Sequence, residues 1–190
     1  MFKNILSETI GNREISHLDP IFEEISDIQY KNLTLVNQLN TGVFTQEDIR
    51  QRLGNIIGDS IDESVNILLP FHTDFGKHIK LGKDIYISMN TVFVDLGGIT
   101  LEDRVLIGPG AYILSVNHIV DPEKRRGLVV KPVLIKENAW IGAKATILPG
   151  VTIGKNSIVS ADATVTKDVP DNVIVAGTPA RVIKEITDEK

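Results

Sequence analysis

Aliphatic residues recur every six positions through the last third of the chain, and this spacing is the strongest structural signal in the sequence. The anchors are Ile135, Ile141, Ile147, Ile153, Val159 and Val165. Four positions after each comes a residue of modest size: Ala139, Ala145, Val151, Ser157, Ala163 and Val169. A helix would show a period of about 3.6 residues and a half-buried strand a period of 2. A period of six instead predicts a parallel β-helix, in which three short strands close each triangular coil.

The same phase continues upstream with two interruptions. It passes through Leu69, Phe75, Leu81, Ile87 and Phe93. It then slips by two positions at Gly97-Gly98 and resumes at Leu101, Ile107 and Ile113. The second interruption, Ile119–Leu128, is polar and charged, and Val129 is expected to rejoin the phase of Ile135. We therefore expect a loop at 119–128 that protrudes from the coil, a kind of segment that commonly carries function.

The first sixty residues follow a different pattern. Asp19-Pro20 predicts a helix start, since an acidic N-cap followed by proline is typical of that position. Thr45 with Asp48 predicts a second helix start of the capping-box type. Solenoids need terminal caps, so we expect a helical hairpin that covers the first coil. The expected division is a helical cap at 1–60 and a β-helix domain at 61–186, which carries the protruding loop and a C-terminal arm.

The composition of the chain argues against several kinds of function. The chain has 190 residues, a formal net charge of −5 and no long basic block, so nucleic acid is not an expected partner. It has no cysteine, which excludes disulfides and thiol catalysis and fits a reducing compartment. No apolar run is long enough for a membrane span or a signal peptide core. These features predict a cytoplasmic protein with no membrane partner.

His118, at the start of the protruding loop, is the candidate proton acceptor. An imidazole has an unperturbed pKa near 6.5, so it can act as a base at neutral pH. The alternative is a surface or structural histidine. His72 and His78 are six positions apart and should fall on neighbouring faces of the prism, so a three-histidine metal site within one chain is not expected.

Trp140 and three cations of the C-terminal region are candidates for ligand binding. Trp140, the only tryptophan, could form a flat apolar wall for a long thin ligand, or could simply cover a face of the coil. Lys167, Arg181 and Lys184 could bind phosphates near one end of the prism, or could be solvated surface charges.

Several motifs resemble the hexapeptide-repeat acyltransferases. They are Asn138-Ala139-Trp140-Ile141-Gly142, Pro149 to Gly154, Val165 to Pro170 and Gly177 to Ile183. Asp74-Phe75-Gly76, His118 with Asp121-Pro122, Asp19-Pro20 and Leu39-Asn40 narrow the resemblance to the maltose and galactoside O-acetyltransferase group. The resemblance covers nearly the whole chain.

The resemblance implies a left-handed coil, a homotrimer with active sites between subunits, and acetyl-CoA as the acetyl donor. It assigns His118 as the catalytic base. It places Trp140 and the backbone at Ala143 and Ala161 along the pantetheine and thioester. The nucleotide end of the coenzyme would lie near Thr166, Lys167, Arg181 and Lys184. Asn90 and Asp95 would belong to the floor of the acceptor pocket.

Three departures from the group concern the acceptor and the coenzyme channel. Ser88 stands where an asparagine is usual, Ser16 stands where an acidic residue is usual, and Ser160-Ala161-Asp162 replaces a Gly-Ala-Gly turn.

We expect an O-acetyltransferase that acts on a hydroxyl of a small sugar or glycoside. The alternatives are the same fold with another acceptor, such as an amino sugar or serine, and a trimeric scaffold without catalysis.

Overall fold

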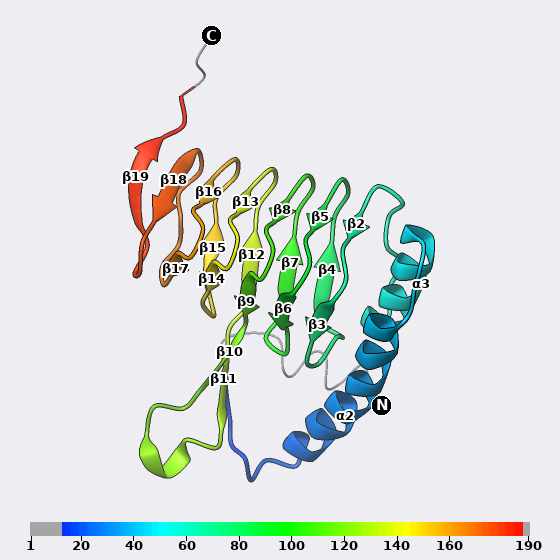
Figure 1. The fold of residues 1–190 in the computed structure, drawn as a ribbon. Coiled ribbons are helices and arrows are strands. Elements are labelled where there is room, and N and C mark those ends of the chain that lie inside the picture. The colour runs from blue at the N-terminus through cyan, green and yellow to red at the C-terminus, as the bar shows by residue number, and fades with distance from the viewer. Residues whose placement is uncertain (1–12, 188–190) are drawn as a thin grey trace.

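The structure, a computed structural model, describes residues 13–187 and shows a long coil of short strands closed at one end by two helices (Figure 1). The described part starts with strand β1 (Arg13–Ile15) and continues into helices α2 (Ile21–Thr41) and α3 (Gln46–Ile57). No helix within these residues is long and apolar enough to cross a bilayer.

Parallel strands of three sheets form the faces of the coil, and within the coil (β2 to β9 and β12 to β18) consecutive strands belong to different sheets. The first face holds β2 (Asn66–Ile67), β5 (Tyr86–Ile87), β8 (Leu106–Ile107), β13 (Trp140–Ile141), β16 (Ile158–Val159) and β18 (Val173–Ala176). The second face holds β3 (Phe71–Thr73), β6 (Thr91–Val94), β9 (Tyr112–Leu114), β14 (Thr146–Ile147) and β17 (Thr164–Val165). The third face holds β4 (Ile79–Leu81), β7 (Ile99–Leu101), β12 (Val133–Ile135) and β15 (Thr152–Ile153). The predicted parallel β-helix is therefore confirmed.

We call the turns between the first and second faces the first edge, those between the second and third faces the second edge, and those that lead to the next coil the third edge. Strand β19 (Arg181–Glu185) pairs antiparallel with β18 and ends the first face. The predicted C-terminal arm is therefore a strand.

The inward aliphatic residues stack from coil to coil, as the repeat predicts. Ile141 pairs with Val159, eighteen positions later, and both are fully buried. In the earlier coils the interval is twenty, as between Ile87 and Ile107. The two extra residues in each of these coils lie in the wider turns of the second edge.

The phase predicted for the first coil is wrong by two positions. The inward residues are Ile67 and Thr73, which pair with Ile87 and Phe93, whereas Leu69 and Phe75 were expected there. Because the first coil also has a wide second-edge turn, a strict count of six backwards from Leu81 arrives at Phe75. Phe75 is buried, but in a separate cluster under α2.

The protruding segment is a small sheet and begins earlier than predicted. Strands β10 (Val116–His118) and β11 (Leu128–Val130) form an antiparallel hairpin around the 3₁₀ helix η1 (Pro122–Lys124), and β1 pairs with the other side of β11. The prediction that Val129 rejoins the coil is wrong, because Val129 pairs with Asn117 and Glu14. The coil resumes at Val133, which pairs with Ile99.

The two helices cap the first coil, as predicted. The Asn40 side chain exchanges two hydrogen bonds with the Phe71 backbone, and Gln46 does the same with Ile67. The Thr45–Asp48 capping box is present at the start of α3. The start of α2 lies one residue later than predicted, because Pro20 and not Asp19 is its N-cap, although Asp19 Oδ1 still accepts the Ile21 N–H. The N-terminal half of α2 continues beyond the coil and packs Ile21 and Ile25 against Val130 of the hairpin.

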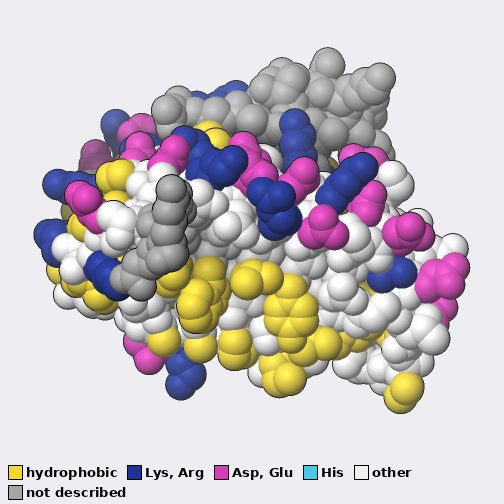
Figure 2. Space-filling model, turned by 90° about the horizontal axis from the view of Figure 1, so that it is seen from above, with side chains coloured by type: hydrophobic (Ala, Val, Ile, Leu, Met, Phe, Trp, Pro, Cys, Tyr) yellow, Lys and Arg dark blue, Asp and Glu magenta, His cyan; other side chains and the backbone are white. Residues whose placement is uncertain are grey.

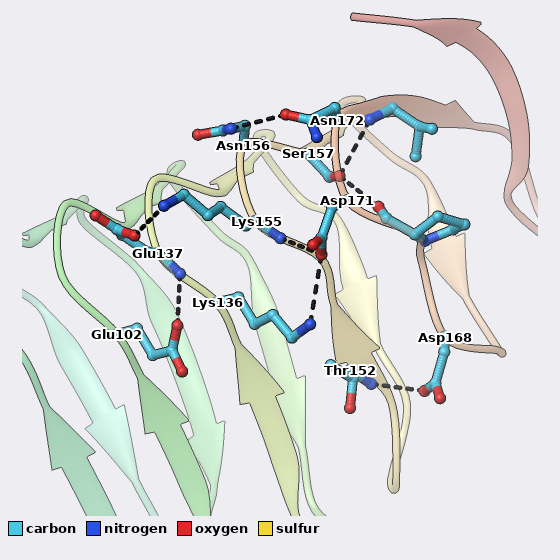
Figure 3. A network of polar contacts seen from close by, with 12 residues as sticks. Glu102, Lys136, Glu137, Thr152, Lys155, Asn156, Ser157, Asp168, Asp171 and Asn172 are labelled. Carbon is cyan, nitrogen blue, oxygen red and sulfur yellow. Dashed lines mark hydrogen bonds and ion pairs between the residues drawn. The ribbon is translucent and has the colours of Figure 1, made fainter.

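Polar side chains bridge successive coils along the third edge (Figure 3). The Glu137 carboxylate contacts Lys155 Nζ at 2.5 Å and also pairs with Arg104. Asp171 accepts the Lys155 N–H at 2.8 Å, and Asn156 donates to Asn172 at 2.7 Å. These contacts hold the last coils in register, away from the two edges that carry the candidate site.

Candidate active site

The turns of the first edge stack directly on one another and carry four of the predicted site residues, Ser88, Asn90, Ala143 and Ala161. The Asn90 N–H donates to Pro70 O at 2.7 Å and the Asp162 N–H donates to Ala143 O at 2.9 Å. Asn90 and Asp162 both take positive φ values, of 60° and 56°. These bonds fix the turns and leave their outer side exposed.

The backbone N–H groups of Ala143 and Ala161 are free donors along this edge. Ala143 is half-buried and Ala161 is exposed, and neither N–H enters any hydrogen bond within residues 13–187. Glycines allow the close stacking that places them there. A Cβ at Gly108 would lie 2.7 Å from the Ala143 nitrogen, and one at Gly142 would lie 2.6 Å from the Ala161 nitrogen. Two amide donors without an acceptor among the described residues therefore lie on this edge, one coil apart.

Trp140 lies on the outer side of the first face, beside this edge. Its side chain is 48% exposed and its strand lies between those of Leu106 and Ile158. Leu106 and Tyr86 continue the exposed apolar row on the neighbouring strands. Figure 2 shows hydrophobic side chains gathered in one band of the molecular surface, next to rows of acidic and basic side chains. Trp140 precedes Ala143 by three residues, so the apolar row adjoins the edge that carries the amide donors.

His118 lies at the end of β10, on the hairpin that leaves the second edge. Its imidazole is exposed, and Nδ1 lies 3.3 Å from the Gly127 carbonyl oxygen. Because a carbonyl can only accept, this contact favours the tautomer with the proton on Nδ1. In that tautomer Nε2 carries the lone pair, which is the form that a general base requires. Sequence reasoning missed Gly127, because the group that acts there is a backbone carbonyl that any residue would supply.

Asp95 is buried, which corrects its predicted place in an acceptor pocket. It is 0% exposed, and its carboxylate accepts from Thr73 Oγ1 at 2.5 Å and from the backbone N–H groups of Gly76 and His78 at 2.8 and 3.1 Å. The hydrogen bonds from these donors to Asp95 hold the wide second-edge turn of the first coil in place. A carboxylate so enclosed has no surface to offer a ligand.

Asp74 lies directly against Asp95 and was noticed in the sequence only as part of a family motif. Asp74 Oδ1 accepts the Asp95 N–H at 3.0 Å, and Oδ2 accepts from Gln29 Nε2 at 3.0 Å. Burial, followed by the charge of Asp95, raises the pKa of Asp74 to about 7. This carboxyl is therefore poised between its charged and neutral forms near neutral pH.

The two serines that depart from the family pattern lie apart. Ser88 is 7% exposed on the first edge, and its N–H donates to Ile107 O at 2.9 Å. Ser16 is exposed between β1 and α2, where its hydroxyl accepts the Leu18 N–H at 3.2 Å. Ser88 therefore lies on the same edge as Ala143 and Ala161. Ser16 instead directly follows β1, the strand that pairs with β11 of the hairpin.

The predicted coenzyme residues do not all meet on one chain. Thr166 and Lys167 follow β17 and lie on the second edge, whereas Arg181 and Lys184 lie on β19 opposite Ala176 and Ile174. All four are exposed, and the three cations form no ion pair within residues 13–187. No three His, Cys, Asp or Glu side chains of these residues gather in a way that could hold a metal ion.

The distance between the first and second edges determines whether a single chain can bring His118 to the amide donors of Ala143 and Ala161. In the third coil, Gly110 ends a first-edge turn and Ser115 begins the hairpin, with β9 between them. Five residues of extended chain span about 16 Å at roughly 3.3 Å per residue. Reacting groups must approach to about 3–3.5 Å. Within one chain, the segment that carries His118 therefore starts well away from the amide donors at Ala143 and Ala161.

Comparisons with known proteins agree with this architecture. The bacterial transferase hexapeptide family (six repeats) matches residues 132–167. The chain is 39% identical over 163 residues to the galactoside O-acetyltransferase of Lactococcus lactis subsp. lactis, over 84% of this chain and 79% of that protein. It is 34% identical to the galactoside O-acetyltransferase of Escherichia coli K12, over 87% of this chain and 83% of that protein.

A solved structure extends the likeness to nearly the full length. The hexapeptide-repeat containing acetyltransferase of Vibrio cholerae, complexed with acetyl coenzyme A, superposes with a TM-score of 0.86 at 30% identity, over 97% of this chain and 99% of that one. With relatives this similar over most of both chains, the protein belongs to the hexapeptide-repeat acetyltransferases, within the maltose and galactoside O-acetyltransferase group.

Proposed function

We propose that the protein transfers the acetyl group of acetyl-CoA to a hydroxyl of a small sugar or glycoside, with His118 as general base. The observation that carries the proposal is the contact between His118 Nδ1 and the Gly127 carbonyl, because it favours the tautomer in which Nε2 carries the lone pair. The names of the galactoside O-acetyltransferase relatives support the acceptor class, and the acetyl-CoA complex of the Vibrio cholerae relative supports the donor.

The transfer is direct. Nε2 of His118 takes the proton of the acceptor hydroxyl while its oxygen attacks the thioester carbonyl carbon. The carbon–oxygen bond forms, the carbon–sulfur bond breaks, and the departing thiolate of CoA takes up the proton. The chain has no cysteine, so no cysteinyl acetyl-enzyme takes part.

The free N–H groups of Ala143 and Ala161 are the proposed donors to the thioester and pantetheine. A preorganised amide that faces the developing oxyanion lowers the barrier because it needs no reorganisation during the reaction. The exposed row of Trp140 and Leu106 supplies an apolar wall for the thioester arm. Thr166, Lys167, Arg181 and Lys184 are the proposed contacts of the nucleotide end, where ammonium and guanidinium groups suit phosphates.

We further propose that the enzyme is a homotrimer whose active site lies between two subunits. The distance between the first and second edges of one chain supports this proposal, since His118 of one subunit must meet the amide donors of its neighbour. Asn90, Ser88 and Ser16 remain the proposed acceptor contacts. Asp95 is not among them, because it is buried.

The test is the release of free CoA by a His118→Ala variant. We expect the rate at saturating acceptor to fall by about 10²–10⁴-fold, the usual contribution of a general base. Binding of acetyl-CoA should be unchanged, because the imidazole is assigned only the proton. His17→Ala, which removes another histidine near the hairpin sheet, is the matched control and should retain full activity. A His118→Ala variant with half the wild-type rate would remove His118 from the mechanism.

A further inference from the structure

Three consecutive cations at the end of the hairpin have no role in the mechanism above. Lys124, Arg125 and Arg126 are exposed, and none forms an ion pair within residues 13–187. Arg125 Nη2 donates to the Val120 carbonyl at 3.2 Å. We call these three residues the hairpin cations.

Two carboxylates share this loop, Asp121 and Glu123. The Asp121 carboxylate accepts the Glu123 N–H at 3.0 Å and so caps η1. Neither carboxylate reaches a hairpin cation closely enough to form an ion pair. The positive charges are therefore available to a ligand, in a protein whose formal net charge is −5.

The hairpin cations are tied structurally to His118. Gly127, which directly follows Arg126, accepts from the Ile119 N–H at 3.2 Å and donates to the Lys124 carbonyl at 2.8 Å. Its carbonyl is also the partner of His118 Nδ1. A Cβ at Gly127 would lie 2.7 Å from the Ile15 carbonyl oxygen, so the strand β1 fixes this closure from the other side. The segment that bears the cations is thus joined directly to the residue whose carbonyl contacts the imidazole.

The coenzyme does not account for charges at this place. Only the thioester of acetyl-CoA has to approach His118, and its phosphates lie beyond the whole pantetheine arm. The ligand that must lie beside His118 with its reacting hydroxyl is the acceptor. Cations on the segment next to His118 are therefore better placed for the acceptor than for the phosphates of the coenzyme.

We propose that the acceptor is a negatively charged sugar derivative, bearing a carboxylate or a phosphate, and that Lys124, Arg125 and Arg126 bind its anionic group. This inference rests on the proposed function and specifies its substrate class. Guanidinium groups pair with planar carboxylates and phosphates through two parallel hydrogen bonds, and the lysine adds a point charge. The short Ser88 and Ser16 agree with an acceptor that differs from a simple neutral glycoside.

The experiment compares matched acceptors on the wild-type enzyme and on a triple variant, Lys124→Gln, Arg125→Gln and Arg126→Gln. Each pair consists of a neutral methyl glycoside and the same sugar as its uronic acid or as its 6-phosphate, and free CoA is measured at low ionic strength. We expect the anionic member to have a kcat/KM about tenfold higher or more, since one close charge pair near a surface contributes on that scale. The advantage should shrink as salt is added.

The triple variant should lose this advantage through a higher KM for the anionic acceptor, with KM for acetyl-CoA and turnover of the neutral acceptor unchanged. Lys80→Gln, which removes an exposed cation of the third face, is the matched control and should change nothing. Calorimetric binding of the anionic sugars, without turnover, should show the same loss in the triple variant. The uronic acid and 6-phosphate pairs decide between carboxylate and phosphate.

Equal kcat/KM within every pair would overturn the inference. So would a triple variant that raised KM for acetyl-CoA instead, since the cations would then serve the coenzyme. Failure of the proposed function looks different, because the wild-type enzyme would then release no CoA with any member of any pair.

Discussion

Asp74 should make the stability of the folded protein fall as pH rises through neutrality. Its pKa is 3.8 in an ordinary environment and rises to about 7 here, because the carboxyl is buried and lies against Asp95. Below pH 4 the carboxyl is protonated in both the folded and the unfolded chain, and Asp74 makes its full contribution to the free energy of unfolding. As pH rises towards 7 the unfolded chain releases the proton first, so the free energy of unfolding declines. At 1.36 kcal/mol per pKa unit, the loss is on the order of 4 kcal/mol.

The replacement Asp74→Asn isolates this contribution, because the amide keeps the shape of the carboxyl and stays neutral at every pH. Its oxygen can still accept the Phe75 and Asp95 N–H groups, and Gln29 can turn its amide to accept from the new NH₂. The assay is denaturant unfolding at pH 5 and pH 8.5 at one protein concentration, which matters if the protein is an oligomer. The variant should gain about 2–4 kcal/mol relative to wild type between the two pH values.

Titrating groups that do not interact with Asp74 cancel in this comparison, since they are common to both proteins. Asp27→Asn, an exposed carboxyl on the same helix, is the control and should show no pH-dependent gain. An Asp74→Asn variant whose stability differs from wild type by the same amount at both pH values would refute the reasoning, because the folded Asp74 would then titrate like the unfolded one.

Three further outcomes follow from individual residues. Gly142→Ala should destabilise the coil by about 1–3 kcal/mol in urea unfolding, because the new Cβ would lie 2.6 Å from the Ala161 nitrogen. Gly142 has no positive φ, so the clash alone is expected to cause the loss, and a variant as stable as wild type would contradict this close approach. Thr45→Ala should cost about 1 kcal/mol by losing the capping box of α3, and an unchanged midpoint would show that the box is dispensable. Ser88→Asn should raise kcat/KM for maltose and simple galactosides, which the wild-type enzyme should use poorly; efficient wild-type acetylation of maltose would show that position 88 does not set the acceptor.

The coil could be predicted from the sequence because a period of six residues is recognisable in the spacing of the aliphatic residues. Ile141 and Val159 could be assigned to one stack from their spacing alone. The first coil was misaligned because a two-residue expansion of a turn, around Asp74 to His78, shifts the phase without changing the character of the residues. Phe75 looked like an anchor because it is buried, but it is buried beneath α2.

The candidate site could be predicted only as a set of residue types. His118 was identified from its place beside the loop, yet its tautomer depends on the Gly127 carbonyl, which has no signature in the sequence. The family resemblance indicated the backbone at Ala143 and Ala161, but whether their N–H groups are free depends on how the turns stack across coils. Asp95 was misjudged because a polar residue in a turn suggests exposure, whereas this one satisfies donors in the interior.

The central claim is that one active site combines His118 of one subunit with the first edge of another, and complementation between two inactive variants tests it most directly. His118→Ala removes the base, and Ala143→Glu fills the wall of the thioester with a charged side chain while His118 remains. The two variants are unfolded together, refolded as an equal mixture, and assayed for acetyl transfer beside each variant treated alone. If each site draws on two subunits, random assembly should restore about a quarter of the wild-type activity, because about one site in four receives an intact residue from both partners. A mixture no more active than the separate variants would contradict the account and place the whole site within one chain.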